Sequence, residues 1–175
     1  MFFRRSFFIN FAAKKMAENV FLSLGSNLGD RLSYLNQAVE ELELCGIKCV
    51  KKSPVYETDS WGYDDEPYLN QVLECETFLT PEKLLEETSK IETLLGRKRT
   101  SGGYEARTID IDILFCDNEI IDIPQLKVPH PKIALRRFVL IPLCDIAPEF
   151  LHPVLKKTVR QLLDECEDTG RVEKF

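Results

Sequence analysis

The sequence predicts an α+β fold in which helices pack on an antiparallel sheet, with the elements in the order β-α-β-β-α-β. Three observations predict this order. An apolar run at residues 20–25 precedes apolar residues at helical spacing, a strong helix start stands at Thr80-Pro81, and residues 108–115 alternate between polar and apolar. The order is that of the ferredoxin-like, split βαβ plan, with additions at the C-terminal end.

The first half of the chain contributes a strand, a helix and a second strand. Residues 20–25 form a short apolar run with a turn directly behind it, which is typical of a buried strand. The helix that follows ends at Gly46, and its apolar stripe consists of Leu32, Leu35, Ala38, Val39 and Leu42. Residues 47–56 predict the second strand, which Pro54 places at an edge of the sheet.

The second half begins with a third strand at residues 68–79. Thr80 offers an N-cap hydroxyl and Pro81 suits the first helical position, so a helix begins there. An apolar stripe runs along this helix until Gly96 ends it.

The fourth strand is expected at residues 108–115. A turn at Asp117-Asn118 follows, and residues 119–123 are expected to pair back as a hairpin. Short helices fill the remainder, the last near residues 158–167. Because the sequence has no repeat, low-complexity tract or linker, we expect one domain.

The composition is that of an ordinary soluble globular protein. Hydrophobic residues make up 44% and charged residues 30% of the chain, and the formal net charge is −6. Such a surface argues against binding to nucleic acid, and no apolar stretch approaches the ~20 residues of a membrane span. Scattered cysteines without a CxxC pair indicate small core residues in a reducing cytosol. We therefore expect a cytoplasmic monomer that holds any polyanionic ligand in a local basic patch.

Residues 1–15 are unlike the rest, because they carry four basic and no acidic residues with aromatic residues between them. Two arginines before a short apolar run resemble a weak signal or transit peptide. The alternative is an upstream start codon, with Met16 opening the domain. We prefer the second interpretation because the apolar run is short and poorly bounded. Residues 1–15 are then an extension, disordered or not translated, before a domain at 16–175.

Two aspartates on the predicted fourth strand carry the strongest chemical signal. Alternation along a strand directs Ile109, Ile111 and Ile113 into the core and leaves Asp110 and Asp112 side by side on the other face. Adjacent carboxylates repel each other. Mg²⁺ would offset the repulsion, because it is held by few carboxylates while phosphate oxygens and water complete its octahedron. On spacing alone, an amphipathic strand with a solvated outer face stays open as the alternative.

A basic, glycine-containing segment precedes this strand. It reads Arg97-Lys98-Arg99-Thr100-Ser101-Gly102-Gly103-Tyr104, and Arg107 follows it. Arginine binds phosphate oxygens in a bidentate fork, and glycines allow a loop to close over a ligand. Cations after a helix C-terminus also complement the helix dipole, but that alternative covers Arg97 and Lys98 and not Arg107. Cations and metal-type acids at one end of a sheet favour phosphoryl transfer.

Other candidates are weaker when taken alone. The segment GSNLGDR lacks the ending of a Walker A motif. His130 could donate to a phosphate, whereas His152 is expected to face solvent. Tyr68 and Phe138 could sandwich a flat heterocycle whose edge Asn70 reads, or could be ordinary core or surface aromatics. A rival class is an RNA-binding module of the same fold, but the aromatic RNP pattern and the basic charge that it requires are missing.

Several segments together resemble the 6-hydroxymethyl-7,8-dihydropterin pyrophosphokinase family. They are LGSNLGDR at 24–31, VYET at 55–58, PYLNQV at 67–72, GRKR at 96–99, RTIDIDIL at 107–114, VPHP at 128–131 and RRFVLIPLCDIAPE at 136–149. The resemblance extends from Met16 to about Leu163, and RTIDIDIL followed by VPH is its most specific part. It implies transfer of diphosphate from ATP to the hydroxymethyl group of 6-hydroxymethyl-7,8-dihydropterin, with release of AMP, in folate biosynthesis.

The resemblance also implies a role for each matching residue. The implied catalytic residues are Arg97, Arg107, Asp110 and Asp112, of which the two aspartates would hold two Mg²⁺ ions. ATP would be bound by Glu92, Arg97, Arg99, Arg107, Ile113, His130 and Arg136. The pterin would be bound by Thr58, Trp61, Tyr68, Asn70 and Phe138, and would stack between Tyr68 and Phe138. The basic segment would close over the site, with Glu92 as its anchor, while the pterin hydroxyl attacks the β-phosphorus in line.

Some positions depart from the family pattern. Gly102-Gly103-Tyr104 stands where many members carry a further arginine followed by tryptophan, so no catalytic arginine is assigned there. Asp59 stands where proline is common and Trp61 where an aliphatic residue is usual, so we expect a bulkier wall of the pterin pocket. Pro131 replaces a frequent aromatic residue, which weakens the nucleotide contact beside His130.

Overall fold

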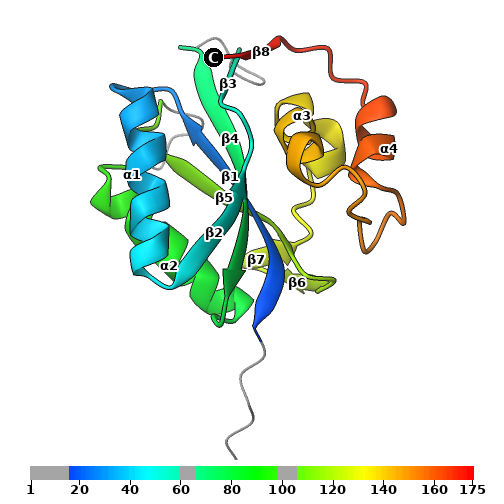
Figure 1. The fold of residues 1–175 in the computed structure, drawn as a ribbon, viewed down its shortest axis with the longest axis horizontal. Helices are drawn as coiled ribbons and strands as arrows, with labels where there is room; N and C mark the ends of the chain where they lie inside the picture. Colours follow the sequence, from blue (N-terminus) through cyan, green and yellow to red (C-terminus); the bar gives the residue numbers. More distant parts are fainter. Residues whose placement is uncertain (1–15, 60–65, 98–105) are drawn as a thin grey trace, which may run out of the picture.

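The structure is a computed structural model that describes residues 16–59, 66–97 and 106–175. Its main sheet has six strands in the order β5-β1-β4-β3-β8, and β2 also pairs with β4 (Figure 1). The strands are β1 (Ala17–Ser26), β2 (Ile47–Lys52), β3 (Tyr56–Thr58), β4 (Tyr68–Thr77), β5 (Asp110–Cys116) and β8 (Val172–Lys174). All pairings in this sheet are antiparallel.

Helices cover both faces of the sheet. The helices α1 (Arg31–Leu44) and α2 (Pro81–Leu94) lie on one face, and α3 (Arg137–Ile146) and α4 (Val159–Asp164) lie on the other. A short hairpin of β6 (Ile121–Ile123) and β7 (Leu126–Val128) and a 3-10 turn, η1 (Ile133–Leu135), precede α3. The order β5-β1-β4-β2 with two helices on one face confirms the predicted ferredoxin-like plan. In the part of the chain that the structure describes, no helix combines the length and apolar character needed to cross a bilayer.

The helix boundaries follow the local signals in the sequence. Asp30 caps α1 by accepting a hydrogen bond from the Ser33 backbone N–H at 3.1 Å. Thr80 caps α2 in the same way, and its partner is the Lys83 N–H. Beyond the C-terminal ends of these helices, Gly46 (φ 78°) and Gly96 (φ 87°) adopt the left-handed backbone that glycine tolerates best. The predicted starts and ends of both helices are therefore confirmed to within a few residues.

Alternation along β1 divides the apolar core between the two faces of the sheet. Val20, Leu22 and Leu24 are buried against α1 and α2, together with Ile109, Ile111 and Ile113 beside them; this placement of the three isoleucines was predicted. Phe21 points the other way and packs with Phe115 under α3 and α4. Further along β1, this second face continues with Ser23 and Gly25, so the apolar packing stops and room is left for a pocket.

Two sequence-based expectations about strands are corrected. The single strand predicted at 47–56 is two strands, β2 and β3, because Pro54 has no N–H for the ladder and the chain bends there. Residues 119–123 do not pair back on β5; their strand β6 pairs with β7. The turn after β5 is held to β1 instead, since the Asp117 carboxylate accepts from the backbone N–H groups of Glu18 and Asn19. The C-terminal strand β8 was not predicted.

The expectation that His152 faces solvent is wrong. Its side chain lies among the buried residues, with 6% of the residue exposed, and its ring packs edge-on against Phe115 at 5.3 Å between ring centroids. The Nδ1 atom accepts hydrogen bonds from the backbone N–H groups of Val154 and Leu155. The imidazole therefore supplies the hydrogen-bond acceptor for two backbone N–H groups of a tight turn.

Candidate active site

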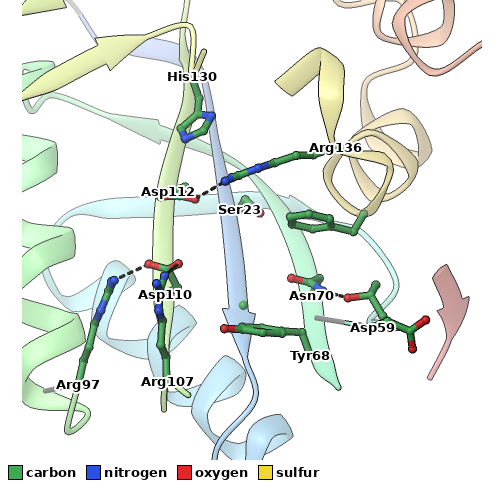
Figure 2. A pocket seen from close by; sticks show the side chains of 13 residues that line it. Ser23, Asp59, Tyr68, Asn70, Arg97, Arg107, Asp110, Asp112, His130 and Arg136 are labelled. Atoms are coloured by element: carbon green, nitrogen blue, oxygen red, sulfur yellow. Dashed lines mark hydrogen bonds and ion pairs between the residues drawn. The ribbon is translucent and has the colours of Figure 1, made fainter. Parts of the chain in front are cut away.

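A cavity of about 250 Å³ opens on the α3 side of the sheet, where β1 has its small residues (Figure 2). It is lined by Ser23, Gly25, Thr58, Asp59, Tyr68, Asn70, Arg97, Arg107, Asp110, Asp112, His130, Arg136 and Phe138. Apart from Ser23, Gly25 and Asp59, all of these residues were predicted from the sequence as site residues. Residues from β1, β3, β4, β5 and α3 thus meet in one place.

The strand register explains the shape of the cavity. Asp110, Gly25 and Asn70 lie directly opposite one another on β5, β1 and β4, and Asp112 lies opposite Ser23 in the neighbouring row. Side chains in such rows stand on the same face. The central strand β1 contributes only the small residues Gly25 and Ser23. The acids of β5 are therefore separated from the Asn70 amide of β4 by a shallow floor of small residues. A ligand resting on that floor contacts both sides.

Asp110 is the more fully neutralised of the two acids. Arg97 Nη1 lies 2.6 Å from one of its carboxylate oxygens and Arg107 Nη1 lies 2.5 Å from the other. Arg97 also donates to Glu92, which is 3% exposed and accepts a further hydrogen bond from the Ile111 backbone N–H at 2.9 Å. Glu92 therefore fixes Arg97 and the end of α2 to the strand that bears the acids.

Asp112 has a weaker partner, because Arg136 Nη1 lies 3.7 Å from its carboxylate. Figure 2 shows Arg136 reaching this acid from the α3 side, while Arg97 and Arg107 approach Asp110. Desolvation in the pocket, followed by the negative charge of Asp110, raises the pKa of Asp112 to about 6. Keeping both Asp110 and Asp112 ionised therefore costs free energy unless a cation binds to them.

This donor set fits Mg²⁺. Among residues 16–59, 66–97 and 106–175, no group of three or more His, Cys, Asp or Glu side chains is placed to hold a metal ion. A site built on Asp110 and Asp112 therefore offers only two carboxylates and leaves most coordination positions to other ligands. Mg²⁺ suits such a site, since it keeps several waters and takes phosphate oxygens from a bound substrate.

His130 is a neutral hydrogen-bond donor at the edge of the pocket. Burial, followed by the nearby positive charges of Arg136 and Lys132, lowers its pKa to about 4. Its Nδ1 atom accepts from the Lys132 backbone N–H at 3.2 Å, so the proton of the neutral ring resides on Nε2. At neutral pH the imidazole therefore offers an N–H group without adding charge.

The opposite side of the pocket is aromatic and amide-bearing. The guanidinium of Arg136 lies 5.6 Å from the centre of the Phe138 ring, and Tyr68 stands across β1 from Asp110. Asn70 Nδ2 donates to Thr58 Oγ1 at 2.7 Å, which fixes the direction of the amide. A Cβ atom on Gly25 would lie 3.1 Å from Asn70 Oδ1, so glycine allows this close approach.

The remaining predicted residues lie elsewhere. Glu92 stands behind Arg97 rather than on the pocket surface. Ile113 lies on the other face of β5, 5% exposed in the core, so a role in ATP binding through its side chain is not supported by its position. Trp61 and Arg99 lie outside the described residues, as does the departure at Gly102-Gly103-Tyr104.

Sequence reasoning missed the small residues of β1 and one asparagine. Ser23 and Gly25 share the strand face of Phe21, so alternation alone would have placed them beside the acids. Asn27 is 2% exposed and exchanges two hydrogen bonds with the Arg107 backbone, while its Nδ2 donates to the Glu66 carbonyl at 3.3 Å. It ties the arginine side of the pocket to the start of β4, and no local sequence signal predicts that role.

The pocket has paired acids and arginines on one side and aromatic and amide groups on the other, which is the chemistry of a phosphotransferase with a flat, polar-edged acceptor. The family model of 7,8-dihydro-6-hydroxymethylpterin-pyrophosphokinase (HPPK) matches residues 21–148. The chain belongs to this family. Its activity is diphosphate transfer from ATP to the hydroxymethyl group of 6-hydroxymethyl-7,8-dihydropterin, a step of folate biosynthesis.

Relatives with known names agree with this membership. The chain is 42% identical over 147 residues to the 2-amino-4-hydroxy-6-hydroxymethyldihydropteridine pyrophosphokinase of Aquifex aeolicus, covering 83% of this chain and 91% of that protein. It is 45% identical over 131 residues to the protein of the same name from Bacillus subtilis, covering 74% and 78%.

Among solved structures, the Plasmodium falciparum HPPK-DHPS protein with pteroate matches with a TM-score of 0.69 at 19% identity. The match covers 86% of this chain and 42% of that one, so the chain spans less than half of the solved protein. At this identity the likeness shows the shared fold.

Proposed function

We propose that this pocket is the catalytic site, with the triphosphate of ATP over Asp110 and Asp112 and the pterin against Tyr68, Asn70 and Phe138. One observation supports this most directly: the acid row and the amide row face each other across Gly25 and Ser23. A hydroxymethyl group on a pterin bound at Asn70 then lies toward the phosphates. Holding both reactants in line supplies much of the rate enhancement of such a transfer.

Asp110 and Asp112 would hold two Mg²⁺ ions. When bound, Mg²⁺ neutralises phosphate oxygens and supports the charge that develops during transfer. The protein's own contribution is to keep both carboxylates on one rigid strand face. The raised pKa of Asp112 supports a cation partner for this acid.

The arginines and His130 would neutralise and orient the phosphates. Arg97 and Arg107 flank Asp110, Arg136 flanks Asp112, and the His130 Nε2–H adds a neutral donor. The pterin hydroxyl oxygen forms a bond to the β-phosphorus, the bond to the α,β-bridging oxygen breaks, and AMP leaves. The hydroxyl proton passes to solvent, so the diphosphate moves intact and no covalent enzyme intermediate forms.

Outside the described residues, Arg99 would add to the phosphate site and Trp61 to the pterin site. Glu92 would act through Arg97, because the two are already paired. We further propose a cytoplasmic monomer in which residues 16–175 form the catalytic domain and residues 1–15 lie outside it. Sedimentation of the purified protein checks the monomer, and the intact mass of protein from its natural source checks the extension.

A product assay tests the function. Purified protein with ATP, Mg²⁺ and the hydroxymethyl dihydropterin is expected to release AMP and one pterin diphosphate per turnover, and neither product without the pterin. Asp110→Ala is expected to abolish this release while the circular dichroism spectrum stays that of the wild type. Release of ADP, or wild-type turnover by the Asp110→Ala variant, would contradict the proposal.

A further inference from the structure

The last residues of the chain complete the sheet beside the pocket. β8 pairs with β3, so that Thr58 lies opposite Val172 and Glu57 opposite Glu173, and the Phe175 N–H donates to the Val55 carbonyl at 3.0 Å. This strand lies beyond residues 21–148 that the family model matches. Without it, the three-residue strand β3 would be the sheet edge next to the pocket, and short edge strands are held weakly.

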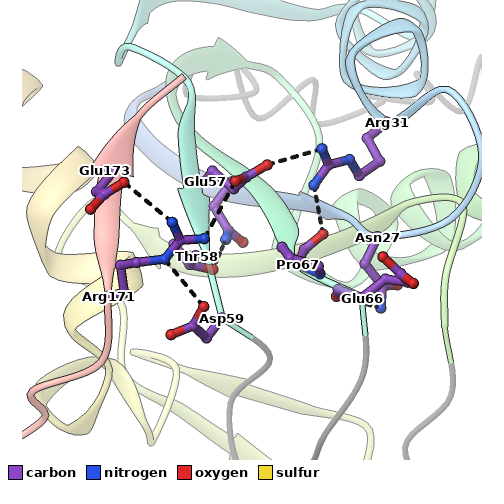
Figure 3. A network of polar contacts seen from close by, with 10 residues as sticks. Asn27, Arg31, Glu57, Thr58, Asp59, Glu66, Pro67, Arg171 and Glu173 are labelled. Carbon is purple, nitrogen blue, oxygen red and sulfur yellow. Dashed lines mark hydrogen bonds and ion pairs between the residues drawn. The ribbon is translucent and has the colours of Figure 1, made fainter.

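Arg171, immediately before β8, contacts three carboxylates at once (Figure 3). Its Nε lies 3.2 Å from Asp59, its Nη2 lies 3.4 Å from Glu57 and its Nη1 lies 3.3 Å from Glu173. Glu57 and Glu173 stand directly opposite each other across the two strands, where like charges repel. The planar fork of arginine meets all three acids in a way that lysine, a point charge, does not.

The network continues to the start of β4. Glu57 uses its second oxygen to accept from Arg31 Nη2 at 3.0 Å, and Arg31 Nη1 donates to the Pro67 carbonyl at 2.7 Å. Arg171 and Arg31 therefore hold β3 from both sides of Glu57. The C-terminal segment is thereby connected to the two strands that present Thr58 and Tyr68 to the pocket.

Thr58 connects this network of ion pairs to the pocket. Its Oγ1 accepts from Asn70 Nδ2 at 2.7 Å, and both residues line the pocket together with Asp59. On β3, Thr58 stands on the opposite face from Glu57, so a shift of the strand moves both. A small displacement of Thr58 would release the Asn70 amide and allow it to rotate.

We propose that Arg171 is a positioning residue that sets the affinity for the pterin by holding β3, and through Thr58 the Asn70 amide, in register with the pocket. The inference rests on the proposed placement of the pterin against Asn70. Arg171 is not among the residues that line the pocket. Its side chain is 42% exposed and that of Asp59 is 62% exposed, so each ion pair alone contributes little to folding. Loss of Arg171 is therefore expected to lower the affinity for the pterin and to change the free energy of unfolding little.

Arg171→Ala is expected to raise the KM for the hydroxymethyl dihydropterin about three- to tenfold, the effect of losing a few exposed ion pairs. The KM for ATP and kcat are expected to stay within about twofold, because the acid row on β5 is not supported by this network. Arg171→Lys is expected to give an intermediate value. In a background carrying Glu57→Gln and Asp59→Asn, the same Arg171→Ala change is expected to have no further effect.

Arg160→Ala is the matched control, because Arg160 is also an exposed arginine paired with a carboxylate, that of Glu149, but lies in α4. It is expected to leave both KM values unchanged. An unchanged pterin KM in Arg171→Ala, when Asn70→Ala raises it, would disprove the role of Arg171 and leave the proposed site standing. If Asn70→Ala also has no effect, the proposed pterin site itself is wrong. If Arg171→Ala worsens both KM values and melts well below Arg160→Ala, its role is general folding, which also overturns the inference.

Discussion

Asp110 and Asp112 are chemically identical side chains in different surroundings. Asp110 is compensated by two arginines at hydrogen-bonding distance, whereas Asp112 has one arginine at 3.7 Å and a raised pKa of about 6. Keeping Asp112 ionised at pH 7 therefore costs free energy in the protein without its ligands. Residues whose pKa is shifted in this way are characteristic of functional sites.

Asparagine substitutions at the two acids are expected to change stability in opposite directions. Without Mg²⁺ at pH 7, Asp112→Asn should raise the free energy of unfolding by about 1 kcal/mol, because it removes a repelled charge. Asp110→Asn should lower it by about 1–3 kcal/mol, because it weakens charged hydrogen bonds to Arg97 and Arg107. Urea titrations measure both, and both variants should lose more than about 100-fold in kcat. Equal changes of one sign would contradict the different roles.

Arg97→Ala is expected to lower kcat by about 100-fold while the KM for ATP changes less than about threefold. The physical reason is that Arg97 already pairs with Glu92 and Asp110 in the ligand-free protein. Replacing these partners with phosphate oxygens adds little binding free energy in the ground state. Arg97 therefore mainly stabilises the negative charge that develops during transfer. Single-turnover kinetics separate the two constants. A raised KM with an unchanged kcat would show that Arg97 only binds the nucleotide.

At the scale of elements, the sequence predicted the features that depend on neighbouring residues, namely where helices begin and end and which face of a strand a side chain occupies. Thr80-Pro81 and the glycines at 46 and 96 marked both helices of the first face, and alternation placed the aspartates of β5 on the pocket face. The pairing of distant segments was not predictable in this way. β8 is three residues long with two charged side chains, and only the backbone edge offered by β3 makes it a strand. The β6–β7 hairpin was assigned to the wrong partner for the same reason.

The turn between α3 and α4 is expected to make stability depend on pH through His152. Burial lowers its pKa, so the folded state binds a proton less readily than the unfolded chain. Its contribution is therefore fully present above the ordinary histidine pKa of about 6.5 and is lost as the pH falls below it. Protonation also removes the Nδ1 acceptor used by Val154 and Leu155.

His152→Asn isolates this effect, because the asparagine Oδ1 can accept the same backbone N–H groups and does not titrate. At pH 7.5 the variant is expected to be less stable than the wild type, since the packing against Phe115 is lost. Between pH 7 and pH 5 the wild type should lose more stability than the variant, so the difference narrows. Thermal midpoints at each pH measure this. A constant difference would show that His152 does not titrate in this range.

At the scale of the whole molecule, most of the pocket could be predicted because its residues lie in recognisable segments. Asp110, Asp112 and Arg107 share one strand motif, and Tyr68 and Asn70 share another. The residues that went unpredicted, Ser23 and Asn27 among them, are small polar residues of a kind that is common outside functional sites, so their type alone does not mark them. Their value comes from being small, or from bridging segments that only the tertiary fold brings together.

An acidic protein that binds a polyanion should show a distinctive response to salt. The net charge of −6 opposes ATP at long range, but a charge about 20 Å away contributes only ~0.2 kcal/mol in water before screening. In the proposed site, Arg107 and Arg136 would act on the phosphates at contact distance inside the pocket, where the interaction is several times larger. The short-range attraction should therefore control affinity. Raising KCl from about 0.05 to about 0.5 M, which shortens the screening length from more than 10 Å to a few Å, is expected to raise the KM for ATP severalfold.

The pterin serves as the internal control in the same titration, because it carries no net charge and, in the proposed site, would rest on aromatic and amide groups. Its KM is expected to change less than about twofold over the same range of salt, since neutral contacts are not screened. Initial rates of AMP release at saturating co-substrate measure both constants. A parallel rise in the two would point to a general effect of salt on the fold, and a fall in the KM for ATP would mean that the acidic surface outweighs the arginines.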